Sequence, residues 1–245
     1  MVNIATTEEL TNLSTPELKN QILELVKGRD VESIKAKCDF YKNQLAPYVS
    51  ELSRRNPFPL VSEQLSIVLG FWKSVWSTIP FQDILPGRIN DQSYQIFHDD
   101  GYYANIARFA PGYQSKFWRI FTSILPAYDL MVLQKYGIKD EQWFIQNVGI
   151  FQGLNKRGKP LTVEEADDWF TKIVTTKFQG DTTTIDLREE VKLDKMDSST
   201  VKKFEKAYLA IPQLEHLYID DDFRLIKSQR EAKQRPSYTI AVRDH

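Results

Sequence analysis

The sequence contains a single cysteine, Cys38, among its 245 residues. One thiol cannot form an internal disulfide, a cysteine-rich zinc site or an iron–sulfur cluster, because each of these needs further sulfur ligands. Cys38 lies in a segment with helical periodicity, where a small buried hydrophobic residue is the ordinary interpretation. We therefore expect no cysteine-based cofactor, and the cysteine content suits a reducing compartment.

Histidine is also scarce, and the common catalytic motifs are missing. His98, His216 and His245 are the only histidines, and no two of them have the i, i+4 spacing of a helical metal site. The sequence has no Gly-x-Ser-x-Gly motif, no phosphate-binding loop and no dinucleotide fingerprint. The consecutive acids at 220–222 lack the alternating ligand spacing of a calcium loop. We therefore expect a non-catalytic protein that holds no metal ion and no cofactor.

Neither sign of charge dominates, since Lys and Arg number 32 and Asp and Glu number 33, for a net charge of −1. A nucleic-acid partner requires a broad basic field, so no such partner is expected. The local exception is a basic tail that contains Arg224, Lys227, Arg230, Lys233 and Arg235. Such a run is usually a solvated face, and the alternative is contact with an anionic surface or an acidic partner.

No apolar run approaches the roughly 20 residues that a membrane-spanning helix needs. We expect residues 1–13 to be a flexible N-terminus. This segment contains Glu8 and Glu9 but no Lys or Arg, unlike a secretory signal or an Arg-rich transit peptide. The prediction is a cytoplasmic protein that works where it is made, unless a presequence has been removed.

Apolar residues make up 42% of the chain and aromatic residues 12%, which is enough for a substantial core. The length suits one domain, which we place at 14–245. Its helical part is expected at 14–55. Its strand-rich part is expected at 65–245.

Within the helical part, Ser14 and Glu17 have the spacing of a capping box before apolar positions that share one helical face. A second helical stretch is expected over 31–55, with a kink at Pro47. The Asn-Pro-Phe-Pro sequence at 56–59 ends it, because the residue before a proline avoids the helical conformation.

Beyond residue 59 the apolar pattern becomes alternating, which is typical of half-buried strands. The expected strands are 69–78, 94–98, 102–109, 116–125, 128–136, 142–151, 172–178, 182–187, 214–219, 223–227 and 238–242. A hairpin turn is expected at 99–101, and short helices at 162–169 and 199–210. This pattern favours a mainly β fold with added α-helices, in which an antiparallel β-barrel carries the N-terminal helices on its outside.

Several segments resemble the signatures of the plastid-lipid-associated protein (fibrillin) family. The matching segments are Asn-Pro-Phe-Pro at 56–59, Leu-Gly-Phe-Trp at 69–72, Val-Trp-Ser-Thr at 75–78, 95–106, 218–225 and 238–243. The resemblance spans roughly 18–243 and is weakest in its middle third. The chain differs from the family at 227–230, where a charged, glycine-free segment follows the late Leu-Arg strand.

The resemblance implies a lipocalin-like β-barrel of the kind found in plastids and cyanobacteria, and the absence of a transit peptide suits a cyanobacterial-type member. Family members associate with lipid bodies and photosynthetic membranes and are regarded as carriers of prenyl lipids, quinones or carotenoids. The resemblance therefore predicts a carrier for an apolar or amphipathic small molecule, peripheral to the thylakoid membrane. One alternative is a scaffold that docks a lipid-synthesis enzyme or a membrane surface. A second is a lipocalin-like bilin lyase.

The tryptophans of the 69–78 strand are candidate ligand-binding residues. Gly70-x-Trp72 is typical of lipocalin barrels, in which the indole plugs the closed end. Strict alternation places Trp72, Ser74 and Trp76 on one inward face and Lys73 on the other. We expect Trp72 to be a core residue at the barrel floor. Trp76, nearer the opposite end, is either a core residue or a ligand contact.

A late arginine completes the predicted site. In lipocalins a late basic residue commonly stacks on the floor indole through its planar cation. Arg224 and Arg243 both lie on expected late strands, and we favour Arg224. The predicted ligand-binding set is therefore Trp72, Ser74, Trp76 and Arg224.

Overall fold

The computed structural model describes residues 6–79, 87–110, 126–178, 198, 201–202, 213–229 and 235–243. Its helices are α1 (Thr7–Asn12), α2 (Thr15–Val26), α3 (Ile34–Phe40), the π-helical turn η1 (Tyr41–Leu45), α4 (Ala46–Ser53), α5 (Val61–Val68) and α6 (Val163–Lys177). Its strands are β1 (Gly70–Ser77), β2 (Arg88–Phe97), β3 (Tyr102–Phe109), β4 (Pro126–Lys139), β5 (Gln142–Lys156), β6 (Gln213–Ile219), β7 (Phe223–Gln229) and β8 (Ser237–Arg243). The predicted mainly β fold with added helices is confirmed.

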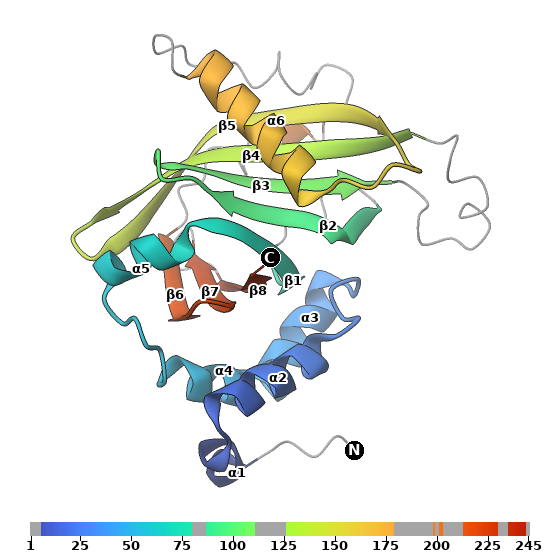
Figure 1. Cartoon of the computed structure of the whole chain (residues 1–245). Helices are drawn as coiled ribbons and strands as arrows, with labels where there is room; N and C mark the ends of the chain where they lie inside the picture. The colour runs from blue at the N-terminus through green and yellow to red at the C-terminus, as the bar shows by residue number, and fades with distance from the viewer. Residues whose placement is uncertain are drawn as a thin grey trace, which may run out of the picture.

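Each strand pairs antiparallel with the next one along the chain, and β8 pairs back to β1, so the described sheet is closed (Figure 1). The predicted β2–β3 hairpin turn is present, and Gly101 adopts a φ of 83° there. Glycine suits this position because a positive φ costs it no steric strain. Successive side chains of each strand point alternately to the inner and the outer face of the barrel wall.

The N-terminal helices pack outside the barrel, as predicted, against β1 and the β6–β8 strands (Figure 1). Capping boxes open α1 and α2, with Thr6 paired to Glu9 and Ser14 paired to Glu17. Helix α1 falls within the segment predicted to be a flexible N-terminus, and its Leu10 is buried against the other helices.

The helix predicted over 31–55 is confirmed from Ile34 to Ser53, with one irregular turn. The π turn η1 ends two residues before Pro47, and the N–H of Ala46 donates to the carbonyl of Tyr41 there. Proline has no amide hydrogen to continue the regular pattern, so the irregularity expected at Pro47 takes the form of this wider turn.

Two further helices differ from the sequence prediction. Helix α5 was not expected, and it covers one end of the barrel next to β6 (Figure 1). The strand predicted at 172–178 is wrong, because α6 continues to Lys177. The β-branched run in this segment favours a strand locally, but Ala166, Phe170 and Val174 recur at helical spacing and are buried against the sheet.

Some predictions lie outside the described residues. These are the strands at 116–125 and 182–187 and most of the helix at 199–210.

The barrel wall is packed on both faces. Inside, an apolar cluster includes Trp72, Phe97, Trp143 and Ile226. Outside, the strands β1 and β6–β8 pack on the N-terminal helices, and the outer faces of β2–β5 pack on α6. Helices therefore cover two sides of the outer face of the barrel.

Candidate functional site

Trp72 lies inside the barrel and is fully buried, as predicted for a floor residue. Its Nε1 donates to the carbonyl of Val68 at the end of α5, over 2.7 Å. Both candidate arginines lie over its ring, with Arg243 at 3.9 Å and Arg224 at 4.9 Å from the centroid. The structure therefore brings together the predicted indole and both of the arginines considered for it.

The two arginines have different surroundings. Arg243 donates to the carbonyls of Ile67, Leu69 and Asp221, so it ties the end of α5 to β8. A cation at a helix C-terminus is favourable because the last carbonyls carry partial negative charge. This arrangement gives Arg243 a structural role at the barrel end.

Arg224 is different because it is buried in the interior, with only 1% of its surface exposed. Its hydrogen-bond acceptors are Nε2 of His216, at 2.9 Å from Nη2, and Oε1 of Gln95, at 3.4 Å from Nη1. Phe97 lies under it at 4.8 Å. Among the described residues no carboxylate forms an ion pair with Arg224. Burial, with a smaller contribution from the nearby charge of Arg243, lowers the pKa of Arg224 to about 9, so it remains a cation at neutral pH.

His216 is held in one neutral form by its neighbours. Because an arginine can only donate, Nε2 of His216 must be the acceptor and Nδ1 must carry the hydrogen. That Nδ1–H donates to Oε1 of Gln64 on α5 over 2.9 Å, and Nε1 of Trp143 donates to the same oxygen. Burial, followed by the positive charge of Arg224, lowers the pKa of His216 well below its ordinary value. The pair Arg224–His216 is therefore a cation beside a neutral imidazole.

A second branch of hydrogen bonds runs from Arg224 around the inner wall. Nε2 of Gln95 and the hydroxyl of Tyr103 donate to Oδ1 of Asn105, over 3.1 and 2.7 Å. Asn105 in turn donates to Gln134, over 2.8 Å. The oxygen of Gln95 faces Arg224 and its nitrogen faces away. The amide dipoles of this belt are therefore oriented to stabilise a positive charge.

Ser74 lies on the same inner face as Arg224. In the sheet, Ser74 pairs with Ala241, and Ala241 pairs with Arg224, so the three form one cross-strand row. The Oγ of Ser74 is buried and has no hydrogen-bond partner among the residues that the structure describes. Ser74 therefore lies on the inward face, as alternation predicted.

The predicted inward orientation of Trp76 is wrong. The β1–β8 register shifts between Ser74 and Trp76, which pairs Trp76 with Ile240 instead of leaving it in the row of inward residues. Trp76 is fully buried on the outer face, and its ring meets Phe40 of α3 edge-on, with centroids 6.1 Å apart. A β-bulge adds one residue to a strand and so reverses the alternation that follows it.

The loop between α2 and α3 contacts the end of β1 that lies farther from α5. Asp30 in this loop is buried and accepts from the backbone N–H of Ser77, over 2.9 Å, and from the guanidinium of Arg88. The Nζ of Lys37 lies 3.6 Å from the same carboxylate. The charged groups at this end are thus paired with one another, in contrast to Arg224.

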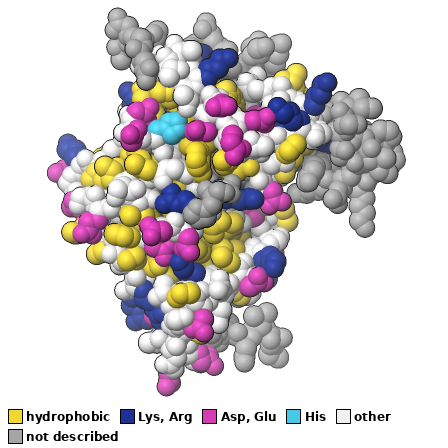
Figure 2. All heavy atoms as spheres, in the orientation of Figure 1, with side chains coloured by type: hydrophobic (Ala, Val, Ile, Leu, Met, Phe, Trp, Pro, Cys, Tyr) yellow, Lys and Arg dark blue, Asp and Glu magenta, His cyan; other side chains and the backbone are white. Residues whose placement is uncertain are grey.

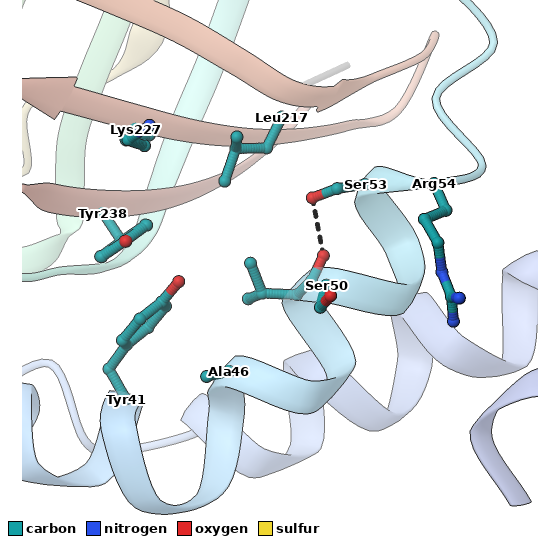
Figure 3. Close-up of a pocket in the computed structure, with 9 residues that line it drawn as sticks. Tyr41, Ala46, Ser50, Ser53, Arg54, Leu217, Lys227 and Tyr238 are labelled. Carbon is teal, nitrogen blue, oxygen red and sulfur yellow. Dashed lines mark hydrogen bonds between the residues drawn. The ribbon is translucent and has the colours of Figure 1, made fainter. Parts of the chain in front are cut away.

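A groove of about 540 Å³ lies outside the barrel, between the helical layer and the β6–β8 strands (Figure 3). In the close-up, Tyr41 of the π turn faces Tyr238 of β8, and their rings stack with centroids 3.8 Å apart. Arg54 and Lys227 also line the groove. Sequence reasoning did not identify this groove, because its walls come from segments far apart in the chain.

Two surface predictions can be compared with the structure. The apolar stripe of the 31–52 helix, which a docking module would expose, is buried on the barrel through Phe40, Leu45, Val49 and Leu52. The basic tail is not one surface patch, since Arg224 points into the barrel interior. On the face seen in Figure 2, Lys and Arg side chains are interspersed with Asp and Glu.

The residues that sequence reasoning missed are Gln64, Gln95, Asn105, Gln134 and His216. Alternation along β2 and β3 could have indicated Gln95 and Asn105, because polar residues on the inward face of a strand are unusual in an apolar core. Gln64 had no such signal, since its helix was not expected.

Comparisons with known proteins give no identification. No family model matches the chain, and no curated protein matches it. The resemblance to the fibrillin family therefore stays a prediction.

Among the residues that the structure describes, no helix is long and apolar enough to cross a membrane. No group of three or more His, Cys, Asp or Glu side chains in this part of the chain could hold a metal ion.

Proposed function

We propose that this chain is a non-catalytic binding or carrier protein for an amphipathic small molecule, whose polar end lies against Arg224 inside the barrel. The observation that supports this function is the buried guanidinium of Arg224, which has neutral acceptors and aromatic rings around it but no carboxylate partner among the described residues.

The energetic cost of this arrangement supports a role beyond folding. Burying a charged group without an oppositely charged partner costs free energy, so a barrel built for stability alone has no need of Arg224. A few placed polar groups among apolar and aromatic side chains are typical of small-molecule sites. The inner wall combines both, with Trp72 and Phe97 beside Arg224 and Gln95.

The resemblance to the fibrillin family points to the same class of ligand. Quinones, oxygenated carotenoids and prenyl lipids each join a long apolar body to an oxygen-bearing end. A carrier for such a molecule would work at the surface of a photosynthetic membrane or a lipid body. The alternative of a docking scaffold loses its helix-based support, because the apolar stripe of α3 and α4 is buried on the barrel.

Ligand titration followed by tryptophan fluorescence tests the proposal. A short-tailed plastoquinone analogue should quench the emission of the protein saturably, at one molecule per chain. Trp72→Phe should remove a larger share of the quenching than Trp76→Phe, because Trp72 lines the interior and Trp76 lies under the helices. Absence of saturable quenching by quinone, carotenoid and fatty amphiphile alike would overturn the proposal. A tetrapyrrole that co-purifies with the chain would favour the lyase alternative.

A further inference from the structure

The interior of the barrel carries positive charge that the described residues do not neutralise. Arg224 and Arg243 share the ring of Trp72, and Arg243 bonds backbone carbonyls. The neighbours of Arg224 are a neutral imidazole and an amide oxygen. Aromatic rings and amide dipoles stabilise a cation only partly when water is excluded. A bound anion would complete the neutralisation.

The donors around this charge are placed to receive such an anion. The bonds of Arg224 to His216 and Gln95 leave part of its guanidinium donor set without a partner among the described residues. Ser74, across Ala241 in the same row, has a buried hydroxyl that also lacks a partner there. Ser74 and Arg224 thus lie on the two strands that flank Ala241, with their side chains on the same inner face of the wall.

We infer that the ligand of this site is an amphiphile with a carboxylate head group, which accepts hydrogen bonds from the guanidinium of Arg224 and the hydroxyl of Ser74. This inference rests on the proposed binding function and specifies its ligand class. A carboxylate matches the planar fork of an arginine in shape and charge. The apolar chain of such a ligand would contact the aliphatic inner residues, which include Ile145, Ile219 and Ile226.

The test compares two ligands of equal chain length with different heads, palmitate and cetyl alcohol. Affinities are measured by displacement of a fluorescent probe from the full-length protein near neutral pH. We expect palmitate to bind the wild type at least tenfold more tightly than cetyl alcohol. Arg224→Gln should abolish this preference, because it should weaken the binding of palmitate far more than that of cetyl alcohol, and Ser74→Ala should reduce the preference in part.

Controls separate this site from the outer groove. Arg54→Gln and Lys227→Gln change the cations of the groove and should leave the palmitate preference unchanged. A preference that is lost in these variants and kept in Arg224→Gln would overturn the inference. Arg224→Lys retains the positive charge without the planar fork, so it should keep part of the preference for palmitate. It serves as the test variant if Arg224→Gln fails to fold.

The outcomes also separate the inference from the function on which it rests. Equal binding of palmitate and cetyl alcohol by the wild type would overturn the carboxylate head group and leave the binding function standing. If palmitate, cetyl alcohol and a quinone all fail to bind, the carboxylate inference and the proposed binding function are both overturned.

Discussion

Trp72 and Trp76 lie on the same strand, β1, but face opposite sides of the barrel wall. The register shift between Ser74 and Trp76 separates them. Trp72 contacts Arg224 and Arg243 inside, whereas Trp76 contacts Phe40 outside. One indole therefore belongs to the candidate site, and the other holds the helical layer to the barrel.

Truncating the two indoles should separate these roles. Trp76→Ala and Trp72→Ala should each lower the free energy of unfolding by roughly 3–5 kcal/mol, the usual cost of removing a large core side chain. In the folded protein, Trp76→Ala should keep its affinity for the quinone probe, and Trp72→Ala should lose affinity. Urea unfolding and ligand titration check both effects. Loss of affinity in Trp76→Ala alone would show that the outer indole is the binding residue.

Gly70 should tolerate a side chain poorly. It has a φ of 96°, and a Cβ there would lie 3.1 Å from Nη1 of Arg243. Gly70→Ala should therefore cost about 1–3 kcal/mol of stability through backbone strain and displacement of Arg243. Gly137→Ala is the matched control, since nothing lies within 4 Å of its Cβ position, and it should change the stability by about 0.5 kcal/mol or less. Equal losses in the two variants, measured by chemical unfolding, would contradict this account.

The buried imidazole of His216 should make stability depend on pH. Its folded-state pKa lies well below the value of 6.5 expected in the unfolded chain, because burial and the charge of Arg224 disfavour its protonation. As pH falls below about 6.5, the unfolded chain takes up a proton that the folded chain refuses, so the free energy of unfolding decreases by up to about 1.4 kcal/mol per pH unit. Above about pH 6.5 His216 is neutral in both states, so the full free energy of unfolding is retained there.

The measurement is the stability of the wild type and of His216→Gln between pH 7.5 and pH 5.5, by urea unfolding. A glutamine amide can accept from Arg224 and donate to Gln64, so the variant keeps the hydrogen bonds without the titration. Its pH slope should be smaller than that of the wild type. An unchanged slope in His216→Gln would contradict the assignment of a neutral imidazole.

The pairing of Asp30 with Arg88 and Lys37 should contribute strongly to the stability of the fold. Asp30→Ala removes the carboxylate that these buried cations share, and breaking a buried ion pair typically costs 3–5 kcal/mol, so we expect a loss of roughly that size. Glu24→Gln, in an exposed pair with Lys27, should cost less than about 0.5 kcal/mol. Thermal unfolding of both variants tests the difference, and a small loss in Asp30→Ala would contradict it.

The sequence was most informative where a pattern acts locally. Alternation identified the strand around Trp72, and the prolines at 57 and 59 marked the end of the helix that finishes at Ser53, although α5 follows them. Alternation could not reveal the bulge after Ser74, because an extra residue in a strand leaves no compositional mark. The strand predicted at 172–178 failed because contacts of α6 with the sheet outweigh the local preference of β-branched residues.

The candidate site was predictable only in part, because local patterns do not reveal contacts between distant segments. Trp72 and Arg224 were identified because lipocalin barrels commonly stack a late basic residue on the indole of a Gly-x-Trp strand. The partners of Arg224 were not, because Gln64, Gln95 and His216 come from distant segments that meet only in the folded barrel. His216 belongs to no sequence motif, so nothing in the sequence indicates that it is buried, neutral and hydrogen-bonded to Arg224.

Native mass spectrometry of the protein purified from its own cells tests the central claim most directly. The account predicts that the intact chain carries one small molecule, which organic solvent removes and which contains both an apolar chain and an oxygen-bearing head. Arg224→Gln, expressed in the same cells, should carry much less of it, and Arg54→Gln should carry the normal amount. A bare wild-type chain, or equal occupancy in wild type and Arg224→Gln, would contradict a ligand held by Arg224 inside the barrel.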